Sequence, residues 1–318
     1  RLKGIRAQFA LEFVISGLAE VWHNMPALSS ASCRVATECG YIVGEEIGQS
    51  WGGLVIANSL LIAIAGAFTS LTITSHLRHC RDRFWFIIFT LAAGLGLGVN
   101  TVWSMHFVGM QALNLGGGKI SGATALLRIE FEVGVTVLSA IAAWLVAAAG
   151  IYVMSNRDVR KRTAVDREMF CRLGRSTALI AVGVVLVHYA GMLSQTGSFD
   201  MEYDPMVILA SASIAAVASS AGLVILMVFP DTFVLRFWSS VIISCAVNSM
   251  HYTGMLAATY RVSSKTRVTL GSYSRPIDGG RVALGVLVFD IVLYAVCQHY
   301  GDQQRRQLEG AAQQNDMR

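Results

Sequence analysis

The chain has 318 residues, of which 54% are hydrophobic and 14% are charged, and its mean hydropathy is +0.55. This composition excludes a soluble globular protein and indicates a chain that needs membrane lipid as its solvent. A formal net charge of +5 does not indicate a nucleic-acid partner here, because the Lys and Arg residues gather in short loops between apolar runs.

The first fifty residues contain no continuous apolar run of membrane length. We therefore expect no cleavable signal peptide, and we interpret residues 1–47 as a peripheral segment outside the membrane. Cys33 and Cys39 in this segment are close enough in the sequence to form one local disulfide. The six cysteines of the chain show no CxxC or CxxCH spacing, so the sequence indicates no zinc site, c-type haem or disulfide scaffold.

Seven apolar runs follow, and a helix of about 20 residues is long enough to cross about 30 Å of hydrocarbon. The seventh run, at 282–299, is the shortest and contains Asp290. The other six runs, which carry no formal charge, are 48–75, 84–118, 133–156, 176–199, 205–230 and 237–260. The sequence therefore predicts an all-α membrane protein with seven transmembrane helices over 48–300, followed by a cytoplasmic tail or linker at 301–318.

Lys and Arg residues in short loops are retained on the cytoplasmic side of a membrane. They gather after the first, third and fifth predicted helices, most densely at 157–175, whereas the loop at 200–204 is acidic. A basic loop at 261–281 opposes this bias. The balance predicts a protein of the plasma (cytoplasmic) membrane, with its N-terminus outside and its C-terminus in the cytoplasm.

A similar His/Met motif lies near the outward end of the second, fourth and sixth predicted helices. The three copies read Met105-His106-Phe107-Val108-Gly109-Met110, Val187-His188-Tyr189-Ala190-Gly191-Met192 and Met250-His251-Tyr252-Thr253-Gly254-Met255. The spacing of the copies predicts three two-helix repeats, with the seventh helix as an extra element.

In each motif the histidine and the methionine that follows it are four residues apart, so on a helix they project from the same face. Imidazole suits copper and other late first-row metals, and thioether sulfur favours Cu(I). Histidines and methionines at one membrane depth therefore indicate copper. Haem is the competing cofactor, because two histidines on facing helices can ligate its iron axially. A lone intramembrane histidine is most often a packing residue, but packing gives no reason to repeat this costly group in three helices.

Other polar groups are predicted near the motifs. Phe107, Tyr189 and Tyr252 follow the histidines and are expected at the lipid headgroup belt, and the two tyrosine hydroxyls are candidates to support a cofactor. Asp290 is expected at a depth similar to that of the histidines. Its carboxylate is a candidate to orient an imidazole by accepting its N–H, and a purely structural hydrogen bond is the alternative.

These motifs, the repeat and the extra helix resemble the MHYT family of integral membrane sensors, over roughly residues 48–300. Residues 250–253 carry the Met-His-Tyr-Thr signature in full, Met105 and His106 keep its first two residues, and Val187 replaces the methionine of the second copy. The resemblance implies a signalling sensor that binds copper and detects oxygen, carbon monoxide, nitric oxide or redox state. The metal-binding residues it implies are His106, His188, His251, Met105, Met110, Met192, Met250 and Met255.

The resemblance also implies an output. Relatives pass their signal to a fused cytoplasmic domain or to a signalling partner, and the sequence contains neither such a domain nor a catalytic motif. We therefore expect a sensor that is not itself an enzyme. Two other functions stay open, a haem-binding membrane electron-transfer protein and a metal transporter, and broken helices near the midplane would favour the transporter.

Overall fold

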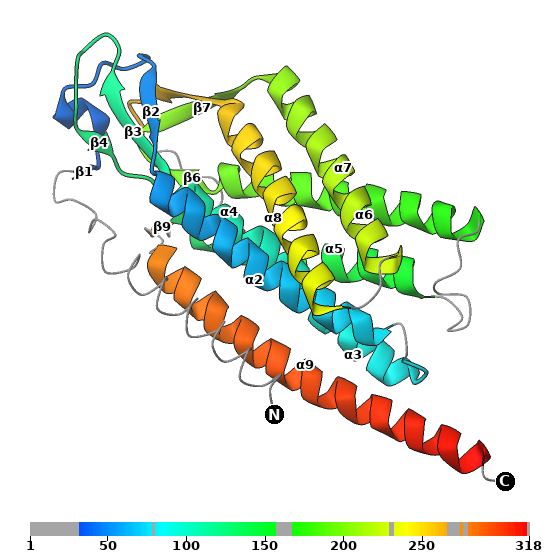
Figure 1. The fold of residues 1–318 in the computed structure, drawn as a ribbon. Helices are drawn as coiled ribbons and strands as arrows, with labels where there is room; N and C mark the ends of the chain where they lie inside the picture. The colour runs from blue at the N-terminus through cyan, green and yellow to red at the C-terminus, as the bar shows by residue number, and fades with distance from the viewer. Residues whose placement is uncertain are drawn as a thin grey trace.

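The computed structural model describes residues 32–77, 80–156, 167–228, 232–265, 274–275 and 279–316. Most of the predicted peripheral segment, at 1–31, lies outside the described residues, as does 157–166, which holds much of the basic charge expected in the cytoplasm. Within the described residues, long helices run side by side and short strands gather at one end of them (Figure 1).

Seven helical segments in the described part of the chain are long and apolar enough to cross a membrane, which confirms the predicted fold class. The second segment is composite, with α3 (Arg83–Gly94), a π-helical stretch η2 (Leu95–Trp103) and α4 (Ser104–Met110) in sequence. The other six are α2 (Gly53–Leu77), α5 (Val133–Ser155), α6 (Arg167–Leu193), α7 (Pro205–Val228), α8 (Phe233–Leu256) and α9 (Gly279–Asp316).

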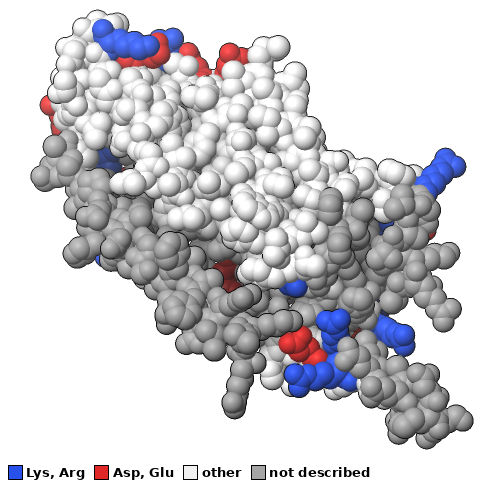
Figure 2. Space-filling view, viewed as in Figure 1, with Lys and Arg blue, Asp and Glu red and all other residues white. Residues whose placement is uncertain are grey.

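The surface agrees with this membrane assignment. Charged side chains gather toward the two ends of the face seen in Figure 2, and the surface between them is largely free of them. Large apolar side chains on these helices are exposed, among them Leu138, Leu186 and Val217, with exposed fractions of 63%, 64% and 70%. Because so much exposed apolar surface is stable only against lipid, the chain is an integral membrane protein.

The strands form a compact layer, which we call the strand cap. Its three sheets have the orders β1-β4-β3-β2, β6-β5-β9 and β7-β8. A disulfide between Cys33 and Cys39 closes the short helix η1 (Ala36–Cys39), as predicted. The strands are β1 (Ser32–Cys33), β2 (Ile47–Trp51), β3 (Leu113–Gly118), β4 (Leu126–Leu127), β5 (Glu130–Glu132), β6 (Gln195–Thr196), β7 (Phe199–Tyr203), β8 (Ala258–Val262) and β9 (Ser274–Arg275).

Several predicted helix boundaries were wrong at the cap. The runs 48–75, 84–118, 176–199 and 237–260 each extend into what the structure forms as strands. Hydropathy alone does not separate a buried strand from a helix, and the cap strands that continue these runs contribute apolar side chains to a buried cluster. At the other end of the chain α9 was underestimated, since it continues as one helix of 38 residues through the predicted tail.

The helices pack as three consecutive pairs with α9 on the outside. The second segment lies against α2, α5 lies against α6, and α7 lies against α8, which matches the predicted repeat. Helix α9 runs along α2, also contacts α4, and extends past the bundle at the end opposite the cap (Figure 1).

The π-helical stretch was not predicted. Its wider turn is seen in the hydroxyl of Thr101, which donates to the carbonyl of Gly96 at 2.8 Å, and in that of Ser104, which donates to Val99 at 2.8 Å. Both bonds reach back five residues. Gly98 lets this stretch lie directly on α5, because a Cβ there would stand 2.2 Å from the carbonyl oxygen of Ala143. A π-helical turn changes the direction of the residues that follow it, and His106 lies one turn further on.

Candidate metal centre

His106 on α4, His188 on α6 and His251 on α8 meet inside the bundle below the strand cap. All three are buried, with exposed fractions of 2%, 2% and 0%. Their Nδ1 atoms form a triangle, with distances of 2.9 Å from His106 to His251, 3.2 Å from His188 to His106 and 3.3 Å from His251 to His188. The rings stand at 71° to 87° to one another, so the three imidazoles are related by an approximate threefold axis.

A glycine from a neighbouring motif faces the outer edge of each ring. A Cβ at Gly109 would lie 2.6 Å from the Nε2 atom of His251, one at Gly191 would lie 2.0 Å from that of His106, and one at Gly254 would lie 2.3 Å from that of His188. Each repeat thus supplies one imidazole and makes room for another. The Nδ1 atoms converge on one point, so they are the nitrogens that a shared ligand can reach, whereas the buried Nε2 atoms face the glycines and have no hydrogen-bond partner among the described residues.

The centre is one of three layers along this axis. Met110, Met192 and Met255 follow the histidines by four residues and lie together in the buried cluster under the cap. Side chains four apart on a helix stand one above the other, so the methionine layer lies between the histidines and the strands. Gln195 donates to the sulfur of Met110 at 3.4 Å and accepts from the hydroxyl of Tyr260 at 2.8 Å, which ties this layer to the cap.

The residues that precede the histidines have other surroundings. Met105 and Met250 are buried, with exposed fractions of 1% and 2%, and they pack into separate apolar clusters. Val187, which replaces the methionine in the second motif, is also buried, at 4%. The histidines and the methionines after them are therefore brought together, whereas the preceding methionines belong to the helix packing below.

The aromatic residues of the motifs do not form a headgroup belt. Phe107 is fully buried under the cap, so that expectation was wrong for it. Tyr189 is half-buried, with its hydroxyl 2.9 Å from that of Ser211, and the hydroxyl of Tyr252 lies 3.0 Å from that of Ser59. Both tyrosines stand edge-on to the adjacent histidine rings and tie α6 to α7 and α8 to α2.

Asp290 lies away from the histidines. Its Oδ1 atom accepts from the side-chain amide of Asn100 at 2.5 Å, and its Oδ2 atom has no hydrogen-bond partner among the described residues. Asn100 lies in η2, six residues and more than one helical turn before His106. The expected depth was therefore wrong, and of the two roles predicted the structural hydrogen bond is the one observed. Nothing in the sequence signalled Asn100 as the partner.

The triangle has the dimensions of a single-ion site. Nitrogens bound about 2.0–2.1 Å from one tetrahedral or trigonal ion lie about 3.3–3.6 Å apart, so a small expansion of the observed triangle would hold an ion. In the described part of the chain, no cysteine, aspartate or glutamate joins the three histidines. The arrangement can thus offer three neutral nitrogen ligands, with thioether sulfur in the adjacent layer.

Comparison with known proteins identifies the repeat. Residues 96–165 and 182–237 match the MHYT family, described as the bacterial signalling protein N terminal repeat. The first match contains His106 and the second contains His188, whereas His251 lies outside both. No solved structure matches the chain significantly.

Curated relatives are similar over most of the chain. The bifunctional diguanylate cyclase/cyclic di-GMP phosphodiesterase MucR of Pseudomonas aeruginosa is 28% identical over 78% of the chain and 33% of its own length. The signaling protein YkoW of Bacillus subtilis is 28% identical over 68% of the chain and 25% of its own length. The cyclic di-GMP phosphodiesterase NbdA of Pseudomonas aeruginosa is 24% identical over 79% of the chain and 30% of its own length. The chain thus spans a quarter to a third of these relatives, and residues 96–165 and 182–237 carry the MHYT repeat of bacterial signalling proteins.

Proposed function

We propose that the three histidines bind one copper ion and that the ion makes the protein a membrane sensor of a diatomic gas (oxygen, carbon monoxide or nitric oxide) or of redox state. The observation that carries the proposal is the triangle of Nδ1 atoms at 2.9–3.3 Å, supplied by three separate helices. Three buried imidazoles that converge on one point are costly in a membrane unless a ligand shares them.

Copper is favoured over other metals by the surroundings of the triangle. Nitrogen ligands bind Cu(II) more strongly than they bind the other divalent first-row ions. The buried thioethers of Met110, Met192 and Met255 suit Cu(I). No carboxylate among the described residues joins the site to balance a double charge. Because burying a charge without a counter-charge is expensive, a monovalent ion suits this apolar site better than a divalent one.

Haem is less well supported. Axial histidines of a haem lie on opposite sides of the macrocycle, whereas these three nitrogens share one small space with ring centroids 4.9–5.3 Å apart. A transporter would be favoured by broken helices, and the seven described spans are continuous, with one π-helical stretch in the second.

Metal analysis tests the proposal. Protein purified in lipid nanodiscs and reconstituted with Cu(I) should retain a single equivalent of copper per chain by elemental analysis. Replacing His106, His188 or His251 with Gln should lower the copper retained, because only two of the three imidazoles remain. The control is His299→Gln, since His299 is exposed on α9. Undiminished copper retention by all three site variants, with circular dichroism confirming folded protein, would refute the centre.

The signal would leave the site through α4 and α9. Helix α4 carries His106 and packs against α9, and α9 continues past the bundle to Asp316. A ligand that changes the packing of α4 would therefore bias the position of α9, and a fused output domain or a separate partner would read it. We propose that this chain is a sensory part without catalytic activity of its own, and that its output acts on cyclic di-GMP, as the names of MucR and NbdA indicate for those relatives.

We also propose that the strand cap faces the outside of the plasma membrane. Disulfides persist in oxidising compartments and are rare in the cytoplasm, and the Cys33–Cys39 disulfide lies in the cap. The loops rich in Lys and Arg favour the same orientation, with the end of α9 in the cytoplasm.

A further inference from the structure

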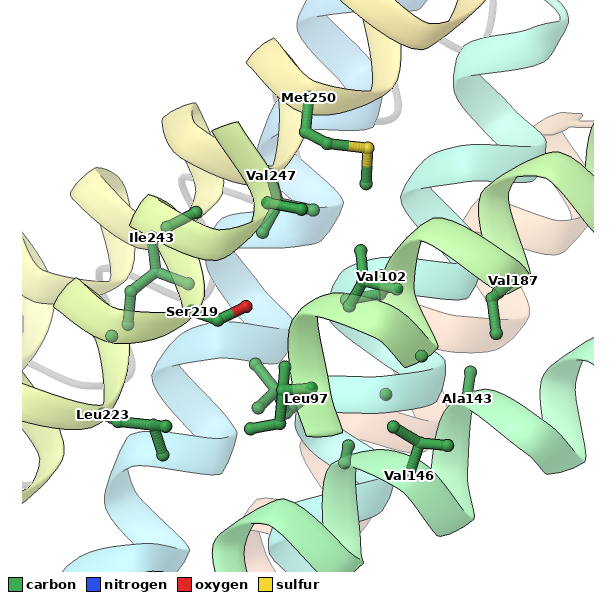
Figure 3. Close-up of a pocket in the computed structure, with 18 residues that line it drawn as sticks. Leu97, Val102, Ala143, Val146, Val187, Ser219, Leu223, Ile243, Val247 and Met250 are labelled. Atoms are coloured by element: carbon green, nitrogen blue, oxygen red, sulfur yellow. The ribbon is translucent and has the colours of Figure 1, made fainter. Parts of the chain in front are cut away.

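An apolar cavity lies inside the bundle among η2, α5, α6, α7 and α8. Its volume is about 60 Å³, and Figure 3 shows side chains from these helices around a common space. Ser219 is the one residue with a polar side chain among the described residues that line it. The remaining lining is aliphatic side chains, glycine and the thioether of Met250.

The cavity lies directly below the histidine triangle. Its lining includes Val102, Val184 and Val247, and each of these residues precedes a motif histidine by four positions. Residues four apart on a helix lie on the same face one turn apart, so these valines form a layer under the three imidazoles. Val187 and Met250, which also line the cavity, directly precede His188 and His251. The cavity therefore lies on the side of the triangle opposite to the methionine layer, and the residues that line it next to the triangle adjoin the histidines in the chain.

The size and lining of the space select its occupant. One water needs about 10–15 Å³ of such a space, so a cavity of about 60 Å³ can admit a diatomic molecule, whereas a lipid chain is far larger. Cavities lined by apolar side chains stay dry and bind apolar gases instead, because water finds no hydrogen-bond partners there. The cap and the methionine layer cover the other face of the triangle, so a gas dissolved in the bilayer has its apolar path here.

We propose that this cavity is a binding site for a small apolar gas and that it delivers the gas from the bilayer to the inner face of the histidine triangle. The inference rests on the proposed function and names the route to its site. It assigns the gas-binding role to residues of η2, α5, α6, α7 and α8, most of which lie outside the His/Met motifs.

Xenon is the probe, and the test uses metal-free protein so that a failure to bind copper leaves its outcome intact. Methyl resonances are followed by NMR in nanodiscs under increasing xenon pressure. The methyls of Ile243, which lines the cavity, should shift along a saturating curve. Those of Ile242, which is 55% exposed to lipid, should shift without saturation. The imidazole nitrogen resonances of His188 should follow the same saturating curve as Ile243.

Two matched variants on α7 complete the design. Ser219→Leu fills the cavity and should abolish the saturating shifts of Ile243 and His188. Ser213→Leu makes the same change at an exposed position of the same helix and should preserve them. A linear response of Ile243 in the unmodified protein, or saturating shifts that survive in Ser219→Leu, would overturn the proposal. Saturation at Ile243 without any response of His188 would overturn the delivery to the histidines.

Discussion

At the residue scale, the centre depends on three glycines, which have no side chain, as much as on the three histidines. The close approach of Gly109, Gly191 and Gly254 to the Nε2 edges leaves no room for a methyl group. The positions of the histidines and of these glycines could be predicted from the three motifs. Their cyclic pairing could not, because it depends on how the three helices are placed around the axis.

The glycine contact gives a prediction with a control on the same helix. Gly191→Ala would place a Cβ 2.0 Å from the Nε2 atom of His106 and must displace the ring. We expect copper affinity to fall by about ten- to a hundredfold, as when groups that orient a metal ligand are changed. Gly174→Ala, also on α6 but with nothing within 4 Å, should keep copper affinity and gain up to ~1 kcal/mol of stability. Equal copper affinities of the two variants in competition titrations would contradict the role of the glycine in positioning the histidine ring.

Glu45 in the strand cap gives a pH dependence. Burial raises the pKa of its carboxyl, but hydrogen bonds from the Ser121 hydroxyl and from the amides of Ser121, Ile42 and Ile120 outweigh this and lower the pKa to about 2. Because the pKa of this carboxyl is about 4.3 in an unfolded chain, its stabilising contribution is complete above that value and is lost as the pH falls toward 2.

We therefore expect hydrogen-exchange protection of the Ile42, Ile120 and Ser121 amides, corrected for intrinsic exchange rates, to fall as the pH decreases from about 4.3 toward about 2. Glu45→Gln should lower the protection at neutral pH and remove most of this dependence. Glu38→Gln, at an exposed cap residue, serves as the control. Unchanged protection across this range would show that the carboxylate does not hold the loop.

At the element scale, the helices could be predicted because each carries its own hydropathic signal. The strands could not, since they are two to six residues long and follow no common pattern, some being apolar and others, such as β5 and β7, carrying carboxylates. The π-helical stretch depends on contacts of Gly96 and Gly98 with α2 and α5, and a single segment does not encode these. The register of α9 against η2 also depends on packing between helices. The sequence of α9 alone does not give this register, so Asp290 was wrongly expected beside an imidazole.

The Asn100–Asp290 pair gives a prediction for α9. Asp290→Asn keeps a polar partner for Asn100 and should preserve both copper binding and stability. Asp290→Leu leaves the buried amide without this partner, which costs about 1–3 kcal/mol, and should lower the unfolding temperature without changing the copper content. Loss of copper from folded Asp290→Asn protein would instead return the carboxylate to a role at the centre.

At the scale of the whole molecule, three repeats build one axial arrangement of a valine layer, a histidine layer and a methionine layer under a cap. The strand cap covers one end of the bundle and α9 extends past the other (Figure 1). The repeat, the number of spans and the convergence of the motifs all followed from the sequence. The cap and the cavity arise only when the repeats pack, because both are built from residues of several helices.

The orientation of the molecule can be tested with thiol labelling of intact cells. Cys171 is exposed near the start of α6, at the end opposite the cap, and should not react with a membrane-impermeant maleimide. Ile120→Cys introduces a thiol at a cap residue that is 72% exposed and should be labelled. After the cells are lysed, both thiols should be labelled to the same extent. Labelling of Cys171 alone in intact cells would place the cap in the cytoplasm.

The most direct test of the metal centre is X-ray absorption spectroscopy of the copper-loaded protein. We expect copper bound by three imidazole nitrogens at about 2.0 Å, with His188→Gln reducing the number of imidazoles. A spectrum with oxygen ligands alone, or one that is unchanged in His188→Gln, would contradict the convergence of the three histidines on one ion.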